Sequence, residues 1–215
     1  MAVAQLWIVR QRQAGYNSRQ MRTRVGSAAL FCVIAAIFLV ELATGAVRND
    51  ARLLRLGALP DSGEIGHEYW RLITFGFSHW DLTHLLLNSV LLLILGPIVE
   101  RRAGTAWLLL VFLTASMASG AGILFKHQLW PSQGVSLGAS GGLFGLLGAA
   151  LVLAFRVPSQ TKFGRMRLII VLAVGLTYSF FPGVSMIGHI IGLIVGTAMA
   201  FLIPRATARP VVADA

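Results

Sequence analysis

Six stretches of the 215-residue sequence are apolar and long enough to cross, or nearly cross, a lipid bilayer. They fall at residues 25–46, 83–99, 105–125, 137–155, 167–181 and 184–203. A helix that spans the hydrocarbon core needs about 20 mostly apolar residues. The sequence therefore predicts an all-α polytopic membrane protein with six transmembrane helices. The second and fifth stretches are short, so a tilted or partly inserted helix, and with it a five-span arrangement, stays open.

The composition agrees with a membrane protein and argues against other classes. Charged residues make up only 12% of the chain, too few to cover the surface of a water-soluble domain. The net charge of +10 does not indicate nucleic-acid binding, because the basic residues lie in short gaps between the apolar stretches instead of on one solvated face. The single cysteine, Cys32, excludes a disulfide framework or a thiol pair for zinc.

The basic residues also predict the topology. Thirteen of the 18 Lys and Arg residues lie before the first stretch or after the second, fourth and sixth stretches, which is one side of a six-span protein. By the positive-inside rule, both termini should be cytoplasmic. We expect a basic cytoplasmic tail (1–24), a membrane domain (25–204) and a short cytoplasmic tail (205–215). The stretch at 25–46 is longer than a signal-peptide core and is interpreted as a retained span.

The long segment at residues 47–82 should lie at the membrane surface. Its acidic and basic residues nearly balance, and leucines are mixed with the aromatic residues Tyr69, Trp70 and Trp80. Such a mixture is typical of the headgroup region. We therefore expect an interfacial first loop with short helices and no further soluble domain.

Two polar residues in the later apolar stretches are candidates for chemistry, because polar groups inside a bilayer are costly. Ser140 lies among glycines 138, 141 and 142, which leave room for a nucleophile and for backbone N–H groups at an oxyanion site. His189 lies beside glycines spaced by four and could act as general base. Small-residue helix packing and a buried, hydrogen-bonded histidine are the alternatives.

A second pair could stabilise an oxyanion. His84 and Asn88 are four residues apart and share one helix face, and both can donate hydrogen bonds. Hydrogen bonding between helices is the alternative. No Asp or Glu occurs between Glu100 and Asp214, so a third catalytic residue could come only from the earlier loops, such as Asp81, and a Ser–His dyad is the simpler interpretation. No metalloprotease motif and no pair of intramembrane aspartates is present, and we expect neither metal nor cofactor.

Together these residues resemble the motifs of the rhomboid family, in the family's order from about residue 68 to residue 200. The motifs are Trp70-Arg71, His84-x-x-x-Asn88, Glu100-x-Arg102, Gly138-x-Ser140-Gly141 with Phe144 and Gly145, and Gly188-His189 with Gly192 and Gly196. The resemblance implies a six-helix bundle with a membrane-embedded first loop and an intramembrane serine protease. Its substrates would be transmembrane proteins within the lipid bilayer.

The resemblance also implies residue roles: Ser140 as nucleophile, His189 as base and then acid, and Asn88, His84 and the Ser140 backbone N–H as oxyanion donors. Phe144 stands where many members have tyrosine, and Gly188 replaces a frequent alanine; neither change removes a catalytic group. A catalytically silent relative that binds transmembrane helices is the alternative function, and a transporter ranks last. The compact chain suggests a bacterial plasma (inner) membrane. Substrate, oligomeric state and membership of the branch that processes sorting-tagged proteins stay open.

Overall fold

A computed structural model describes residues 25–156 and 162–204, so the predicted tails at 1–24 and 205–215 lie outside the described residues. Each of the six apolar stretches coincides with a helix. These helices are α2 (Val25–Ala43), α5 (Leu82–Ala103), α6 (Thr105–Leu129), α7 (Ser140–Arg156), α8 (Lys162–Tyr178) and α9 (Met186–Leu202). In the described part of the chain, α2, α5 and α6 are long and apolar enough to cross a membrane, and α7 and α9 are apolar but shorter.

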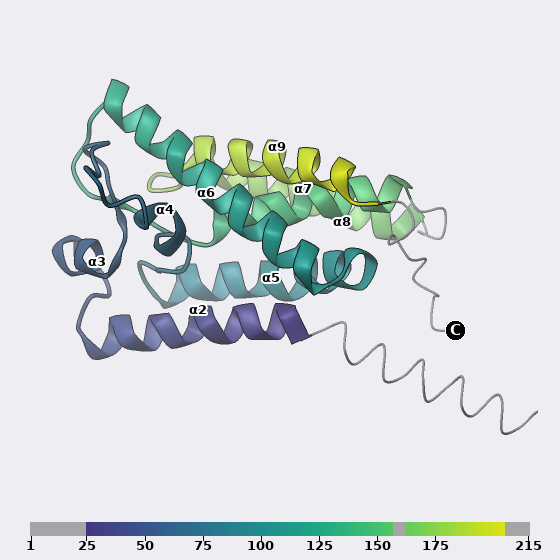
Figure 1. Cartoon of the computed structure of the whole chain (residues 1–215), viewed down its shortest axis with the longest axis horizontal. Coiled ribbons are helices and arrows are strands. Elements are labelled where there is room, and N and C mark those ends of the chain that lie inside the picture. Colours follow the sequence, from purple (N-terminus) through teal and green to yellow (C-terminus); the bar gives the residue numbers. More distant parts are fainter. Residues whose placement is uncertain (1–24, 157–161, 205–215) are drawn as a thin grey trace, which may run out of the picture.

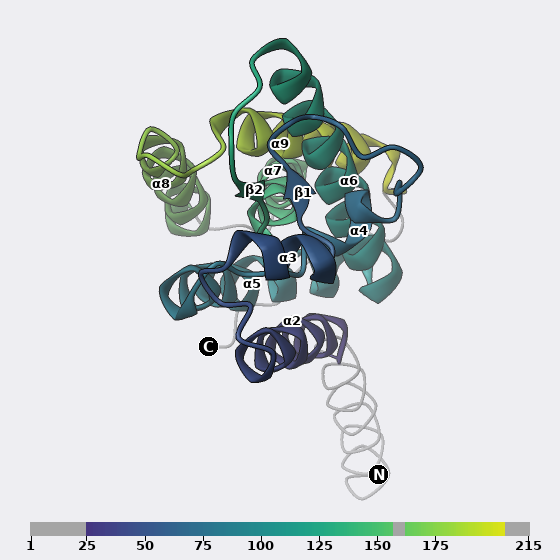
Figure 2. The ribbon, with the colours of Figure 1, turned by 90° about the vertical axis from the view of Figure 1, so that its left-hand side faces the viewer.

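Helix α7 is the centre of the bundle. It packs against α5, α6, α8 and α9, and Figure 2, a view along the bundle, shows it enclosed by them with α2 outside, against α5. Residues 141–150 of α7 are all buried. Glycine or alanine occupies positions 141, 142, 145 and 148–150 of this helix. Such small residues let neighbouring helices approach closely, which suits α7 to the central position.

Glycines bring α7 and α9 into backbone contact. A Cβ atom on Gly192 would overlap the carbonyl of Gly141, and one on Gly196 would overlap the carbonyl of Gly145. Small residues allow such close approach in membrane helix pairs. The glycines four residues apart on α9 therefore determine how near His189 comes to the start of α7.

Three helices extend several residues beyond the apolar stretches that predicted them, and one of these, α8, begins at Lys162 instead of near residue 167. Helix α5 continues to Ala103 instead of ending near residue 99, and α6 continues to Leu129 instead of ending near residue 125. In α5 the reason is Glu100, a fully buried carboxylate that accepts hydrogen bonds from the backbone of Gly26 and Ser27 and from the hydroxyls of Ser27 and Thr105. A charge that is satisfied in this way does not end a helix.

The first loop contains two short helices, α3 (Asp50–Leu56) and α4 (Arg71–Thr74), as the sequence predicted. It also contains a two-residue strand, β1 (Leu59–Pro60), which pairs antiparallel with β2 (Val135–Ser136), with Leu59 opposite Ser136. Arg71 holds the loop together: it donates to the carbonyls of Leu54 and Ala58 at 2.5 and 2.9 Å and pairs with Glu68. Its guanidinium also lies over the ring of Trp70.

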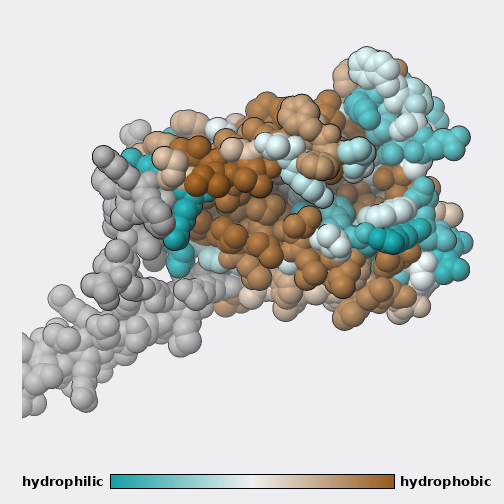
Figure 3. Space-filling model, turned by 180° about the vertical axis from the view of Figure 1, so that it is seen from behind, coloured by the Kyte–Doolittle hydropathy of each residue, from teal (hydrophilic) through white to brown (hydrophobic). Residues whose placement is uncertain are grey.

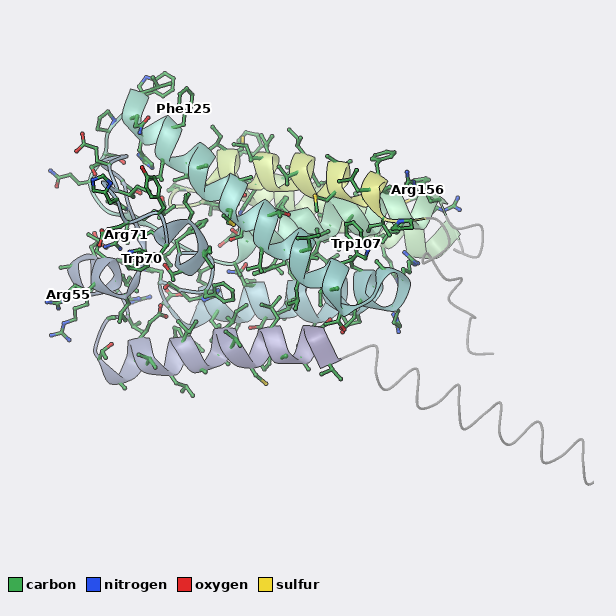
Figure 4. All side chains as sticks on the ribbon, in the orientation of Figure 1. Arg55, Trp70, Arg71, Trp107, Phe125 and Arg156 are labelled. Atoms are coloured by element: carbon green, nitrogen blue, oxygen red, sulfur yellow. The ribbon has the colours of Figure 1, made fainter. Side chains whose placement is uncertain are left out.

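Polar and apolar surfaces separate along the bundle. In Figure 3 a broad apolar band lies between hydrophilic residues at the two ends. Arg55, Trp70 and Arg71 mark the end that carries α3 and α4, and Trp107 and Arg156 lie toward the other end (Figure 4). Helix α2 begins and α9 ends at the end opposite α3 and α4 (Figure 1). This distribution is that of an integral membrane protein, since lipid contacts the apolar band.

Candidate active site

The hydroxyl of Ser140 and the imidazole of His189 meet where α7 begins. Ser140 Oγ lies 2.8 Å from Nε2 of His189, a hydrogen-bond distance between residues 49 positions apart in the sequence. His189 is 4% exposed, and Ser140 is half-buried. The backbone contact of α9 with Gly141 allows this approach. A base at this distance from a hydroxyl can accept its proton.

The segment before Ser140 brings backbone N–H groups to the same place. The first hydrogen bond of α7 joins Leu143 N–H to the Ala139 carbonyl at 3.0 Å, so the N–H groups of residues 140–142 precede the helical ladder. Gly138 takes a φ of +126°, which residues with a side chain rarely adopt. This turn lets the chain enter α7 with Ser140 as its first residue.

His84 and Asn88 of α5 lie on the other side of this turn. A Cβ atom on Gly138 would be 2.7 Å from the His84 ring and 3.9 Å from Nδ2 of Asn88. Asn88 is 4% exposed, and its Nδ2 has no hydrogen-bond partner in the described part of the chain. An unpaired buried donor is costly, so this amide is available to a ligand oxygen that reaches the site.

The imidazole of His189 is held on its face as well as at its edge. The ring of Phe144 stacks on it with centroids 4.2 Å apart and an angle of 9° between the planes. Gly175 of α8 lies against the Phe144 ring, whose Cζ would be 2.8 Å from a Cβ atom at position 175. The stack therefore joins α7, α8 and α9 at one point.

Sequence reasoning missed one residue of the site, Ser179. Its Oγ lies 2.6 Å from Nδ1 of His189, and it donates to the Gly175 carbonyl at 2.8 Å. No motif or spacing singles out this serine, because it follows the last turn of α8 in an ordinary run of aromatic residues. A polar side chain at the end of an apolar helix was the only available signal.

Asp81, the acid considered as a third catalytic residue, is engaged elsewhere. Its carboxylate accepts the backbone N–H of His84 at 2.9 Å as the N-cap of α5 and pairs with Arg48 at 3.0 Å. The hydrogen bond from His84 N–H, followed by that from Arg48, lowers the pKa of Asp81. The position is thus structural: Asp81 starts the helix that carries His84 and Asn88.

Most of the other motif residues take part in packing between elements. Trp70 and Arg71 organise the first loop, Glu100 joins α5 to α2 and α6, and the glycines line helix contacts. Arg102 is buried, and its Nε and Nη1 have no hydrogen-bond partner in residues 25–156 and 162–204. Gly188 contributes its carbonyl, which accepts a hydrogen bond from Ser119 Oγ at 2.7 Å.

Within the same described ranges, His, Cys, Asp and Glu form no group of three that could hold a metal ion.

Comparisons with known proteins agree with these motifs. A family model described as the Rhomboid domain matches residues 66–206. The rhomboid protease GluP of Bacillus subtilis (strain 168) is 34% identical over 181 residues, which cover 81% of this chain and 34% of that protein. The putative rhomboid protease YdcA of the same strain is 34% identical over 142 residues, 65% of this chain and 70% of that protein.

A third relative aligns over most of both chains. The rhomboid protease GlpG of Salmonella choleraesuis (strain SC-B67) is 29% identical over 210 residues, which cover 93% of this chain and 74% of that protein. By contrast, the chain spans only about a third of the length of GluP and of the RHOMBOID-like protein 4 of Arabidopsis thaliana.

Proposed function

Because this chain belongs to the rhomboid family, we propose that it is an intramembrane serine endopeptidase whose catalytic dyad is Ser140 and His189. The observation that carries the proposal is the 2.8 Å contact between Ser140 Oγ and His189 Nε2 within the apolar bundle. A hydroxyl and a base at this distance can form a covalent acyl intermediate.

In the first step, Ser140 Oγ attacks the carbonyl carbon of the scissile peptide bond while its proton moves to Nε2 of His189. The C–N bond then breaks, and the imidazolium returns the proton to the leaving amine. Water then attacks the resulting ester while His189 takes a proton from the water, and His189 gives that proton to Ser140 Oγ as the new carboxyl group leaves. Formation and hydrolysis of the acyl intermediate can therefore both use the same base, Nε2 of His189.

The negative charge on the carbonyl oxygen needs donors that are already in position. The amide of Asn88, the ring N–H of His84 and the backbone N–H of Ser140 fill this role in the proposal. The buried, unpaired Nδ2 of Asn88 supports it, as does the start of α7, where free N–H groups and the helix dipole favour an anion. Preorganised donors of this kind are often the largest contribution to catalysis.

The proposal includes six transmembrane spans, with α7 as a shielded central one. Seventeen residues of helix extend about 26 Å, less than the roughly 30 Å of the hydrocarbon core. Since neighbouring helices surround α7, its first residue can stop below the membrane surface and still meet polar groups. The first loop then lies at the membrane surface on the side from which Ser140 is reached.

We also propose that both termini lie on the cytoplasmic side of a bacterial inner membrane, and that residues 25–204 form one membrane domain between two cytoplasmic tails. The beginning of α2 and the end of α9 at one end of the bundle support this, together with the basic residues of the connecting segments (Figure 1). The substrates are membrane proteins with a transmembrane segment that unwinds readily, since peptide bonds inside a helix are not accessible to a nucleophile.

The experiment that tests the proposal uses the full chain purified in detergent and a fluorophosphonate probe, which labels activated serines. Wild type is compared with Ser140→Ala and His189→Ala. Two matched controls make the same changes elsewhere: Ser116→Ala, at a buried serine of α6, and His67→Ala, at an exposed histidine of the first loop.

Labelling of wild type and of both controls, and its loss in both dyad variants, is the expected result. If all five proteins fold and none is labelled, the proposal fails and a catalytically silent helix-binding protein takes its place. If His189→Ala is labelled as fast as wild type, the dyad is wrong even though Ser140 is reactive.

A further inference from the structure

Ser179 contacts the nitrogen of His189 that faces away from Ser140. Its hydroxyl lies 2.6 Å from Nδ1, whereas Ser140 Oγ lies 2.8 Å from Nε2, so the imidazole is held between Ser140 at the start of α7 and Ser179 just after α8. Ser179 is 3% exposed, so its hydroxyl is shielded from the surface. When the second nitrogen of a histidine has a hydrogen-bond partner, the orientation and tautomer of its imidazole are better defined than in a pair without such a partner.

The two contacts of Ser179 allow one arrangement of protons. The hydroxyl has a single hydrogen, and Ser179 Oγ lies within hydrogen-bond distance of both the Gly175 carbonyl and His189 Nδ1. A carbonyl can only accept, so the hydroxyl donates to Gly175 and accepts from an N–H at Nδ1. Nε2 is then unprotonated and can accept the proton of Ser140. This tautomer is the one that a general base requires.

Helix α8 fixes the imidazole through a second contact on its face. The carbonyl of Gly175 accepts the hydrogen bond from the Ser179 hydroxyl. The same residue lies against the Phe144 ring that stacks on His189. The end of α8 thus controls both the edge of the imidazole and the ring beside it. No carboxylate among the described residues contacts Nδ1, since Asp81 is occupied by Arg48 and the α5 N-terminus.

We propose that Ser179 is a positioning residue for the reaction: its hydroxyl accepts the Nδ1–H of His189, selects the tautomer with a free Nε2, and stabilises the imidazolium that forms when Ser140 loses its proton. This inference rests on the proposed function and deepens it, since it assigns to a neutral hydroxyl just after α8 the place that a carboxylate holds in a Ser–His–Asp triad. In this role Ser179 acts through His189 Nδ1 and not on the substrate directly.

The expected size of the effect follows from the type of hydrogen bond. Bonds to charged groups are stronger than neutral ones, and losing one at the imidazolium should slow the chemical step by roughly 10- to 100-fold. The loss should be smaller than for the carboxylate of a triad, because a hydroxyl carries no full charge. Substrate binding should not change, since Ser179 acts only through His189.

The experiment uses the full chain in detergent with two readouts. Hydrolysis of a synthetic transmembrane peptide, with a fluorophore and a quencher on either side of a run of small residues, gives kcat and KM separately. The second-order rate of fluorophosphonate labelling at Ser140 reports reactivity without substrate recognition. The variants are Ser179→Ala, Ser179→Thr, which keeps the hydroxyl, and Ser116→Ala, the same chemical change at a buried serine whose Oγ has no partner in the described residues.

We expect Ser179→Ala to lower kcat and the labelling rate by roughly 10- to 100-fold with unchanged KM, because a charged hydrogen bond is lost. Both rates of Ser179→Thr should stay within a few-fold of those of wild type, and both rates of Ser116→Ala should equal those of wild type. If Ser179→Ala lowers the thermal midpoint so far that it does not fold, Ser179→Cys carries the test: its sulfur is a weak acceptor, and its rates should lie between those of the serine and alanine forms.

Wild-type rates in Ser179→Ala, a rise in KM alone, or a folded Ser179→Thr as slow as the alanine variant would each overturn the inference. These outcomes differ from failure of the proposed function. If wild type is labelled at Ser140 and Ser179→Ala is labelled equally fast, only the role of Ser179 is wrong. If wild type itself is neither labelled nor active, the dyad and the positioning role fail together.

Discussion

The phenyl ring of Phe144 lies parallel to the imidazole of His189, with ring centroids 4.2 Å apart. Phe144 belongs to α7, four residues after Ser140, so the helix that carries the proposed nucleophile also carries the ring that supports its base. One turn of helix separates the two positions, which places both side chains on the same face. The spacing of Ser140 and Phe144 is therefore part of the site geometry.

Replacing Phe144 by leucine should lower kcat by about 2- to 10-fold, since stacked aromatic pairs contribute about 0.5–1.5 kcal/mol beyond their buried area. The measurement is peptide hydrolysis together with a thermal midpoint. Phe38→Leu, at a buried phenylalanine of α2, is the control and should affect stability alone. Equal kcat values for the two variants would show that the stack does not orient His189.

Replacing Asn88 by alanine should lower the turnover number by roughly 10- to 1,000-fold, the range for one oxyanion donor. KM should change little, because the amide bonds to the oxygen mainly in the transition state. Ser89→Ala, at the next buried position of α5, is the control. A rise in KM with normal turnover would instead assign Asn88 to substrate binding.

Replacing Gly192 by valine should prevent α9 from packing on α7. A side chain there overlaps the Gly141 carbonyl, and a clash with backbone should cost more than about 3 kcal/mol or abolish folding, since the backbone cannot repack like a side chain. Ile194→Val, at a lipid-facing position of the same helix, should leave the thermal midpoint near that of wild type. A stable but inactive Gly192→Val protein would contradict the packing role.

The helices could be predicted because hydrocarbon length and apolar composition specify them directly. Each apolar stretch coincides with a helix, and the family assignment follows from motifs that lie in order along the chain. The helix ends could not be predicted in the same way. The charged residue Glu100 marks the end of the apolar stretch in the sequence, but hydrogen bonds from α2 and Thr105 satisfy its carboxylate, and the residue lies inside α5.

The site shows the same division between local pattern and tertiary contact. His84 and Asn88 share a helix face by spacing alone, and glycines around Ser140 and His189 indicate close packing. Ser179 has no such signal, because its role depends on where α8 ends relative to His189. The pairing of β1 with β2 was likewise not predictable, since two-residue strands leave no periodicity to detect.

The segment before Ser140 is attached to the first loop by Asp61. Its carboxylate accepts from Ser136 Oγ at 2.7 Å and lies 3.4 Å from Nε2 of the buried His127. Asp61→Ala should lower the free energy of unfolding by about 1–3 kcal/mol, the cost of unpaired buried groups, and should slow labelling of Ser140. Glu64→Gln, at an exposed acid of the same loop, is the control. Unchanged stability and labelling would show that the loop is held without this contact.

The buried residue His79, which lies between α4 and α5 in the chain, should make stability depend on pH. Burial, and then the nearby His84, lowers the pKa of His79 from its ordinary value of 6.5 to about 3. Between these values the unfolded chain binds a proton that the folded chain does not. Stability from this residue is therefore complete above about pH 6.5 and falls as the pH drops toward 3, by at most about 1.4 kcal/mol per unit.

Thermal midpoints in detergent from pH 8 to pH 4.5 should decline below pH 6.5, and His79→Gln should flatten that decline. Asp81 does not contribute to the decline in this pH range. The pKa of its carboxyl is lowered from the ordinary value of 3.8, so the stability that it provides is lost only below that value. His67→Gln, at an exposed histidine, should keep the wild-type slope. If His79→Gln keeps it too, the pH sensitivity arises from another group, and the neutral imidazole of His79 is not what acid disrupts.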